Sequence, residues 1–315
     1  MGGGLRVAPI FVPRRAATPP PVTPHVRTRP RGAAPRRFRF GDPLFRGVSL
    51  AFALSVIAIG CTVAGVLYVR SAPARAAFGW SFLWTSAWDP VALRFGALPF
   101  IFGTVATTAI ALTIALPVGL GAAICLAELL PRQVADVLTF LIELLVAVPS
   151  VVYGLVGVFV LVPAMRSFGT IVSGALGSVP LFAGPSYGIG LLTAGVLLAV
   201  MIVPFIIAVS REVLLAVPRA QRDAALALGA TRWETVRHVV VPYARAGILG
   251  SVFLALGRAL GETLAVTMVI GNRPQIVASL FAPAATMAAV LANEFTEADS
   301  TVYLAALVEV GLVLF

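Results

Sequence analysis

Long apolar runs without a charged residue recur along this chain of 315 residues, and they constrain its fold more than any other feature. Residues 48–69 form the first of these runs, flanked by Arg46 and Arg70. A run of about 20 apolar residues is long enough to cross a bilayer as an α-helix. Only 11% of the residues are charged, whereas a soluble domain carries roughly 25%. The sequence therefore predicts an all-α polytopic membrane protein.

The positions of these runs predict six transmembrane helices. They lie at 48–69, within 95–127, near 137–162, at about 190–209, at about 247–270 and from residue 301 onward. Pro117 is expected to kink the second helix, because proline removes a backbone donor, and Pro149 lies inside the third. Residues 163–189 are rich in Gly, Ser and Pro and are expected to form an exterior loop.

Two stretches near the end of the chain complicate this count. Residues 274–293 are uncharged and long enough to span the membrane, but Pro274 and Pro283 favour an exterior segment that skims its surface. The run from Thr301 to Phe315 holds 15 residues. It is about 22 Å long as a helix, short of the ~30 Å hydrocarbon core, which leaves open whether the natural chain continues.

Composition divides the chain into four parts. Residues 1–46 hold ten arginines and many prolines but little apolar surface to offset the entropy of ordering. We expect them to be a disordered basic cytoplasmic tail. The first transmembrane helix is assigned to 47–70. Residues 71–97 contain three tryptophans. Tryptophan rings favour the lipid headgroups, so we expect this segment to be an exterior loop. The remaining helical core, 98–315, contains a charged island at 211–246.

The placement of the arginines predicts the orientation in the membrane. The chain has 23 arginines and no lysine. Seventeen of them would lie on one side, namely ten before residue 47, Arg132 and six in the island. Five would lie on the other side, and Arg258 lies within an expected helix. Cytoplasmic loops carry an excess of Arg and Lys, so the N-terminus and the natural C-terminus are both expected in the cytoplasm. Cys61 and Cys125 lie in apolar stretches, so no disulfide or metal site is expected.

The charged island carries helix-boundary signals of its own. Pro218 suits the first turn of a helix, and Gly229 suits a helix end in the left-handed conformation. Thr231 and Glu234 have the spacing of a capping box. The sequence therefore predicts a tight turn between two short helices on the cytoplasmic side.

These two helices are expected at about 218–228 and 232–241, with Pro242 ending the second one. An ordinary amphipathic loop on the inner leaflet is the alternative interpretation. The spacing of seven residues favours a more specific role. They are Asp223, Ala224, Ala225, Gly229, Val239, Val241 and Pro242.

This spacing resembles the cytoplasmic loop motif of ABC importer permeases, with Asp in place of the usual Glu and Val in place of the usual Ile and Leu. The resemblance implies the MetI-like permease fold of type-1 ABC importers, with one extra N-terminal helix. It also implies that 98–315 is the permease core and that the loop 211–246 docks onto a cytoplasmic ATPase. The sequence has no Walker-type phosphate-binding motif, so we expect a separate chain to hydrolyse ATP.

Two ionisable residues, Arg258 and Glu262, interrupt the fifth expected helix. At a spacing of four they would share one face of that helix, and ionisable residues at such depth are functional candidates. A guanidinium matches oxyanion geometry, and a nearby carboxylate can accept a hydrogen bond only from an anion that keeps a proton. The pair predicts an anion path that favours hydrogen phosphate over sulfate; a structural ion pair is the alternative. Glu143 and Glu128, near the inner ends of their helices, are expected to be interfacial or packing residues. Glu143 stays a candidate for the path, and Tyr153 is either a residue that lines the path or a packing aromatic.

Residues 257–272 read GRALGETLAVTMVIGN, and this run resembles the corresponding helix of PstC-type permeases of bacterial phosphate importers. Shorter motifs carry the same resemblance: VPSVVYG at 148–154, FGALPF at 95–100, SLFAP at 279–283 and NEFT at 293–296. The likeness covers about residues 47–315. Sulfate and molybdate permeases share the RALGE core, so the continuation TLAVTMVIGN is what points to phosphate.

The resemblance implies the transmembrane subunit of an ATP-driven importer of inorganic phosphate in the bacterial plasma membrane. Its expected partners are a second homologous permease, two copies of a cytoplasmic ABC ATPase, an extracytoplasmic phosphate-binding protein and membrane lipid, but no nucleic acid. No cofactor or metal is expected on this chain, because the partner subunit would use the ATP. The alternatives are a sulfate or molybdate ABC permease and an ion-coupled secondary anion transporter. A membrane-embedded enzyme is disfavoured, because the expected spans show no nucleophile–base or metal-ligand cluster.

Overall fold

The computed structural model describes residues 41–315, which are largely helical. The tail up to residue 40, and with it most of the predicted disordered segment, lies outside the described residues. The chain separates into two units whose boundary, between Ile57 and Ala58, falls inside helix α1 (Gly41–Arg70). This helix begins before the predicted start at residue 47 and includes Pro43, which a first helical turn tolerates.

The segment 71–97, expected to be an exterior loop, contains short regular elements. They are α2 (Ala72–Phe78), the 3₁₀ helix η1 (Gly79–Leu83) and two antiparallel strands, β1 (Trp88–Asp89) and β2 (Arg94–Phe95). Between the strands, Asp89 Oδ1 accepts hydrogen bonds from the backbone N–H groups of Val91 and Ala92, at 2.9 and 3.0 Å. Local bonding of this kind orders the segment.

The second transmembrane helix agrees with its predicted position. It consists of α3 (Leu98–Ile124), which contains Pro117, and the π-helical turn η2 (Cys125–Leu129).

The prediction of a third helix at 137–162 is wrong, because the chain breaks at Val148 and Pro149. Both residues are extended, and they separate α4 (Arg132–Ala147) from a new helix. That helix comprises α5 (Ser150–Val156), the π-helical turn η3 (Gly157–Leu161) and α6 (Val162–Leu176). Proline cannot donate a backbone hydrogen bond and forces the preceding residue out of the helical conformation. The loop expected at 163–189 therefore begins only after Leu176.

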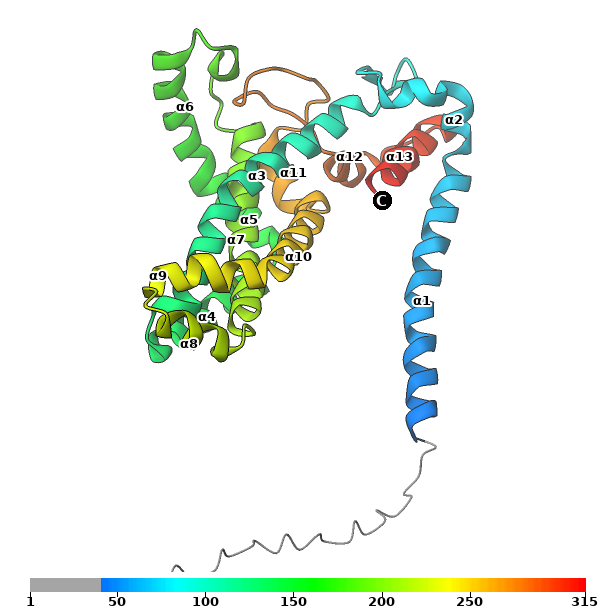
Figure 1. The fold of residues 1–315 in the computed structure, drawn as a ribbon. Coiled ribbons are helices and arrows are strands. Elements are labelled where there is room, and N and C mark those ends of the chain that lie inside the picture. Colours follow the sequence, from blue (N-terminus) through cyan, green and yellow to red (C-terminus); the bar gives the residue numbers. More distant parts are fainter. Residues whose placement is uncertain (1–40) are drawn as a thin grey trace, which may run out of the picture. The chain divides into compact units, whose positions relative to one another are not determined.

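The next two long helices flank the island. After the 3₁₀ helix η4 (Pro180–Phe182) come α7 (Leu191–Leu215), α8 (Arg219–Ala227), α9 (Arg232–Thr235), the π-helical turn η5 (Val236–Val240) and α10 (Val241–Leu260). In Figure 1, α4, α8 and α9 gather at one end of the second unit, and α6 lies at the opposite end.

Pro242 does not end the second island helix, contrary to the prediction. The last three of these elements form one continuous helix that runs past it. In η5 the N–H of Val241 bonds to the carbonyl of Val236, five residues back. This wider turn accommodates a proline that has no N–H of its own.

The fifth transmembrane helix starts and ends earlier than the predicted 247–270. It ends at Leu260, and a short break precedes α11 (Leu264–Ile270). Glycine weakens a helix, and both Gly257 and Gly261 lie at this end. The remaining elements are α12 (Met287–Glu294) and α13 (Thr301–Leu314). Most of 274–293 is not helical, so it does not form a further spanning helix.

Five described helices are long and apolar enough to cross a bilayer. They are 43–70, 98–129, 150–176, 191–215 and 232–260. With α13, an apolar helix below that length, their number is consistent with the expected six.

Glycines allow α3 and α7 to pack closely at the centre of the second unit. A Cβ atom at Gly195 would lie 2.6 Å from Cγ2 of Ile110, and one at Gly119 would lie 2.8 Å from Cγ2 of Ile206. Neither contact leaves room for a side chain. The two helices therefore form a fixed pair against which other elements pack.

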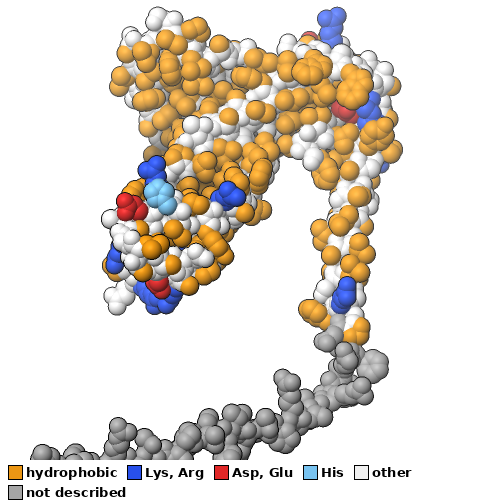
Figure 2. Space-filling view, viewed as in Figure 1, with side chains coloured by type: hydrophobic (Ala, Val, Ile, Leu, Met, Phe, Trp, Pro, Cys, Tyr) orange, Lys and Arg blue, Asp and Glu red, His pale blue; other side chains and the backbone are white. Residues whose placement is uncertain are grey.

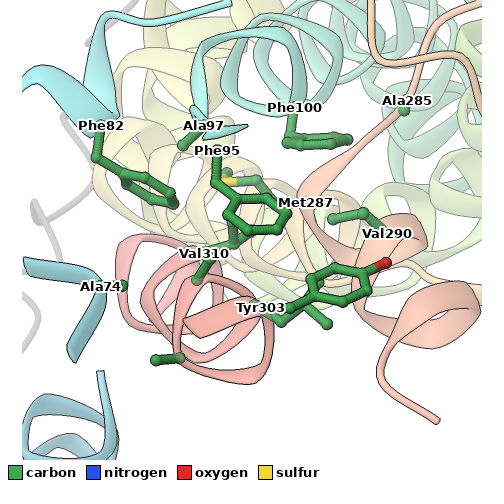
Figure 3. Close-up of a cluster of buried hydrophobic side chains, with 13 residues drawn as sticks. Ala74, Phe82, Phe95, Ala97, Phe100, Ala285, Met287, Val290, Tyr303 and Val310 are labelled. Carbon is green, nitrogen blue, oxygen red and sulfur yellow. The ribbon is translucent and has the colours of Figure 1, made fainter. Parts of the chain in front are cut away.

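An aromatic cluster joins the segment 71–97 to the last helix. The rings of Phe95 and Tyr303 stack with their centroids 5.1 Å apart, and Phe100 lies in the same cluster (Figure 3). Glu294 accepts hydrogen bonds from Trp88 Nε1 at 2.8 Å and from the Tyr303 hydroxyl at 2.6 Å. The carboxylate thus ties two of the cluster's aromatic residues together.

Candidate functional site

The turn at the centre of the island has the predicted geometry. Gly229 follows α8 with a φ of 89°, in the left-handed region that favours glycine. The N–H of Glu234 donates to Thr231 Oγ1 at 3.3 Å, and Glu234 Oε2 accepts from the N–H of Thr231 at 2.8 Å. These reciprocal bonds form the predicted capping box.

Arg222 attaches the first island helix to the ends of two transmembrane helices. Its Nη2 donates to Glu128 Oε1 at 2.7 Å and to the carbonyl of Leu214 at 2.8 Å, and its Nη1 donates to the carbonyl of Val217. The side chains of Arg222 and Glu128 are only 17% and 12% exposed. Sequence reasoning missed this attachment, since no sequence signal connects two residues 94 positions apart.

Most residues of the loop motif face outward. Asp223, Ala224, Gly229 and Pro242 are exposed, whereas Ala225, Val239 and Val241 are partly buried. Large apolar residues are exposed beside them: Leu228 at 90%, Trp233 at 57% and Leu226 at 44%. Figure 2 shows charged side chains gathered at the same end of the second unit. Exposed apolar residues rimmed by polar ones are typical of a protein-binding surface.

Arg258 and Glu262 do not share a helix face. Arg258 is exposed in the last turn of α10, whereas Glu262 follows the end of that helix. Glu262 Oε1 accepts a hydrogen bond from the N–H of Ala265, at 3.3 Å, at the start of α11. Among residues 41–315 the ion pairs do not include one between these two side chains. The alternative of a self-neutralising pair is therefore wrong for this conformation.

The hydroxyl of Tyr153 makes a structural contact. It donates to the carbonyl of Leu145 at 2.8 Å. This bond spans the break between α4 and α5. Glu143 is exposed on α4. Three or more potential metal-ligating side chains do not gather anywhere in the described part of the chain.

Comparisons with known proteins place these features in context. Residues 115–315 match the family model described as the binding-protein-dependent transport system inner membrane component. The phosphate transport system permease protein PstC of Mesorhizobium japonicum is 48% identical over 93% of this chain and 90% of its own length. PstC of Haemophilus influenzae is 44% identical over 87% of this chain and 88% of its own length. A solved MetNI methionine ABC transporter in inward-facing conformations has a TM-score of 0.46 at 20% identity, covering 70% of this chain and 88% of its own.

Proposed function

Because this chain belongs to the inner membrane components of binding-protein-dependent transport systems, and among them to the PstC-type permeases, we propose that it carries inorganic phosphate across the bacterial inner membrane. It would do so as one transmembrane subunit of an ABC importer. The observation that carries this proposal is the 48% identity to a named phosphate permease over 93% of the chain.

We propose that a separate, cytoplasmic ATPase drives transport and docks on the island. The exposed Leu226, Leu228 and Trp233 support this, because a partner surface would bury them. Through Arg222, a pull on α8 would reach η2, at the end of the second transmembrane helix, and the end of α7. Alternating access would follow as the helices move between inward-open and outward-open arrangements.

Besides this chain and the first ATPase, the full importer would contain three further subunits. They are a second permease that shares the translocation path, a second copy of the ATPase and a binding protein that delivers phosphate from outside. The N-terminus and the natural C-terminus would face the cytoplasm, on the same side as the island. The excess of arginines on that side supports the orientation.

Arg258 is proposed to contact the phosphate on its way through the membrane. Its guanidinium forms no ion pair within residues 41–315 and is exposed, so its charge remains available to an anion. Glu262 would accept a hydrogen bond from hydrogen phosphate and repel sulfate, which has no proton to donate at neutral pH. One oxygen of this carboxylate bonds to the Ala265 N–H.

Replacing Arg258 by Gln tests the proposed path. Losing one charge-assisted contact should lower phosphate uptake by about ten-fold or more. Arg166→Gln, at an exposed arginine on α6 outside the island, is the control and should leave uptake unchanged. Uptake of labelled phosphate is measured in cells, and assembly is checked by copurification of the partner subunits. Normal uptake by the Arg258 variant would remove this residue from the path.

Replacing Glu262 by Gln tests the selectivity. Glutamine keeps an acceptor for the Ala265 N–H but removes the negative charge, so sulfate should begin to compete with labelled phosphate. In the unchanged protein an excess of sulfate should leave phosphate uptake intact. If sulfate blocks transport there and phosphate does not, the chain is a sulfate permease. Uptake that follows the proton gradient, with no ATPase copurifying, would instead indicate a secondary transporter.

A further inference from the structure

A cavity of about 490 Å³ lies between the island and the neighbouring transmembrane helices. Its walls come from η2, the start of α4, the end of α7 and α8. Seven charged residues line it: Arg132, Arg211, Arg219, Arg222, Glu128, Asp136 and Asp223. Arg258 and Glu262 are not among the lining residues, so this cavity is separate from the proposed transport path.

The carboxylates neutralise some of these arginines but not all. Arg222 pairs with Glu128 at 2.7 Å, and Arg211 lies 3.4 Å from Asp136. Arg132 and Arg219 take part in no ion pair within residues 41–315. These two guanidinium groups therefore face the same cavity without an ion-pair partner among the described residues, and the lining as a whole, with four arginines and three carboxylates, carries a net charge of +1.

Arg211 lies in the wall of the cavity, where two carboxylates hold its guanidinium. Its Nη1 donates to Glu212 Oε1 at 3.0 Å, and its Nη2 donates to Asp136 Oδ1 at 3.4 Å. Arg211 is therefore fixed in position, and the cavity's arginines without an ion pair in the described part of the chain are Arg132 and Arg219.

The backbone adds positive potential at the same place. α4 begins at Arg132 after Pro131, which offers no side-chain acceptor, so the first N–H groups of this 16-residue helix lack side-chain caps. Such N–H groups and the helix dipole favour an anion at a helix N-terminus.

We propose that this cavity binds a phosphate group. Guanidinium forks match phosphate oxygens in a bidentate geometry, and arginines from α4, α7 and α8 surround the space. Two molecules supply such a group: an anionic phospholipid, through its headgroup, and free inorganic phosphate. The exposed apolar side chains of Val137, Leu141 and Leu144 on α4 favour the phospholipid, because they offer a surface for its acyl chains.

The test compares two double variants of the full chain, purified with the subunits that accompany it. Arg132→Gln with Arg219→Gln removes the two unpaired charges of the cavity. Arg237→Gln with Arg245→Gln removes two exposed arginines outside its lining and is the matched control. Titration with phosphatidylglycerol or phosphatidylcholine, followed by native mass spectrometry, measures the lipid. Equilibrium dialysis with labelled phosphate measures the free ion, in an Arg258→Gln background that removes the proposed transport contact.

The cavity variant should bind phosphatidylglycerol, or free phosphate, at least about ten-fold more weakly than the control variant. A loss in the lipid titration assigns the site to a headgroup, and a loss in the dialysis assigns it to the free ion. Equal binding by both variants in both experiments would overturn the proposal, as would phosphatidylcholine binding as tightly as phosphatidylglycerol. If the double variant does not assemble, the two single variants decide. Because the readout is binding, failed transport by the unchanged protein would leave this result interpretable.

Discussion

At the scale of single residues, the island depends on a backbone conformation that few residues adopt. Gly229 has a φ of 89°, and a Cβ atom added there would meet nothing within 4 Å. A side chain at this position would therefore cost energy through its backbone conformation and not through a clash. A substitution at Gly229 therefore tests the backbone conformation of the turn without disturbing the packing around it.

Gly229→Val should loosen the association of the ATPase, because the left-handed conformation costs a residue with a Cβ about 1–2 kcal/mol. Gly229→Asn is the control, since Asn adopts this conformation more readily. The measurement is the amount of ATPase that copurifies with each variant. An unchanged complex with valine would contradict the docking of the island.

At the scale of elements, two contacts hold different elements of the second unit together. Arg222 and Glu128 join α8 to the end of the second transmembrane helix. At Gly103, in α3, an added Cβ would lie 2.0 Å from the carbonyl oxygen of Ala285. The first contact depends on charge, and the second depends on the absence of a side chain.

Glu128→Gln should lower the melting temperature of the purified protein. It leaves the largely buried Arg222 without its countercharge, and breaking such a pair costs about 3 kcal/mol. Glu212→Gln is the matched control, because the Glu212 side chain is 72% exposed beside Arg211 and surface ion pairs contribute little. Equal melting temperatures for the two variants would contradict a structural role for the pair.

Gly103→Ala should destabilise the protein by about 1–3 kcal/mol, because the added methyl group overpacks the contact with the Ala285 backbone. Gly121→Ala is the control on the same helix, where an added Cβ meets nothing within 4 Å. It should be neutral or slightly stabilising. Thermal unfolding of both variants in detergent measures the difference, and a Gly103 variant as stable as the control would show that α3 can shift.

At the scale of the whole molecule, the orientation assigns opposite ends of the helices to opposite sides of the membrane. Leu228, in the island, is 90% exposed, and Val91, between β1 and β2, is 95% exposed. They lie on segments separated by an odd number of the expected spans, so they should face different compartments.

Single cysteines at these two positions test the orientation. Cys61 and Cys125 are both free and are first replaced by Ser. A maleimide reagent that cannot cross membranes should then label Val91→Cys in cells with a permeable outer envelope, but not Leu228→Cys. Opening the inner membrane should make Leu228→Cys reactive. The reverse pattern would mean that the island faces outward.

Signals local in sequence predicted the structure well, and relations across the chain escaped prediction. Thr231, Glu234 and Gly229 act within a few residues, so their roles were predictable from spacing. Apolar runs located the helices but not their ends, because hydropathy continues smoothly across the break at Pro149.

The same limit explains the misplaced geometry of the candidate site. Arg258 and Glu262 are four residues apart, which suggested one helix face, but the helix ends between them. The pairing of Arg222 with Glu128 depends on how α8 packs against η2. Only the folded chain brings these two residues together.

The π-helical turns η2, η3 and η5 have a consequence for how these helices are probed. Each bonds five residues back, so it carries one residue more than an α-helical turn. One residue corresponds to about 100° of rotation. A helical wheel drawn straight through Val236–Val240 would therefore assign Arg258 and its neighbours to the wrong side relative to Trp233. When positions are chosen for cross-linking, one helical wheel should be drawn for the residues before each π-helical turn and another for the residues after it.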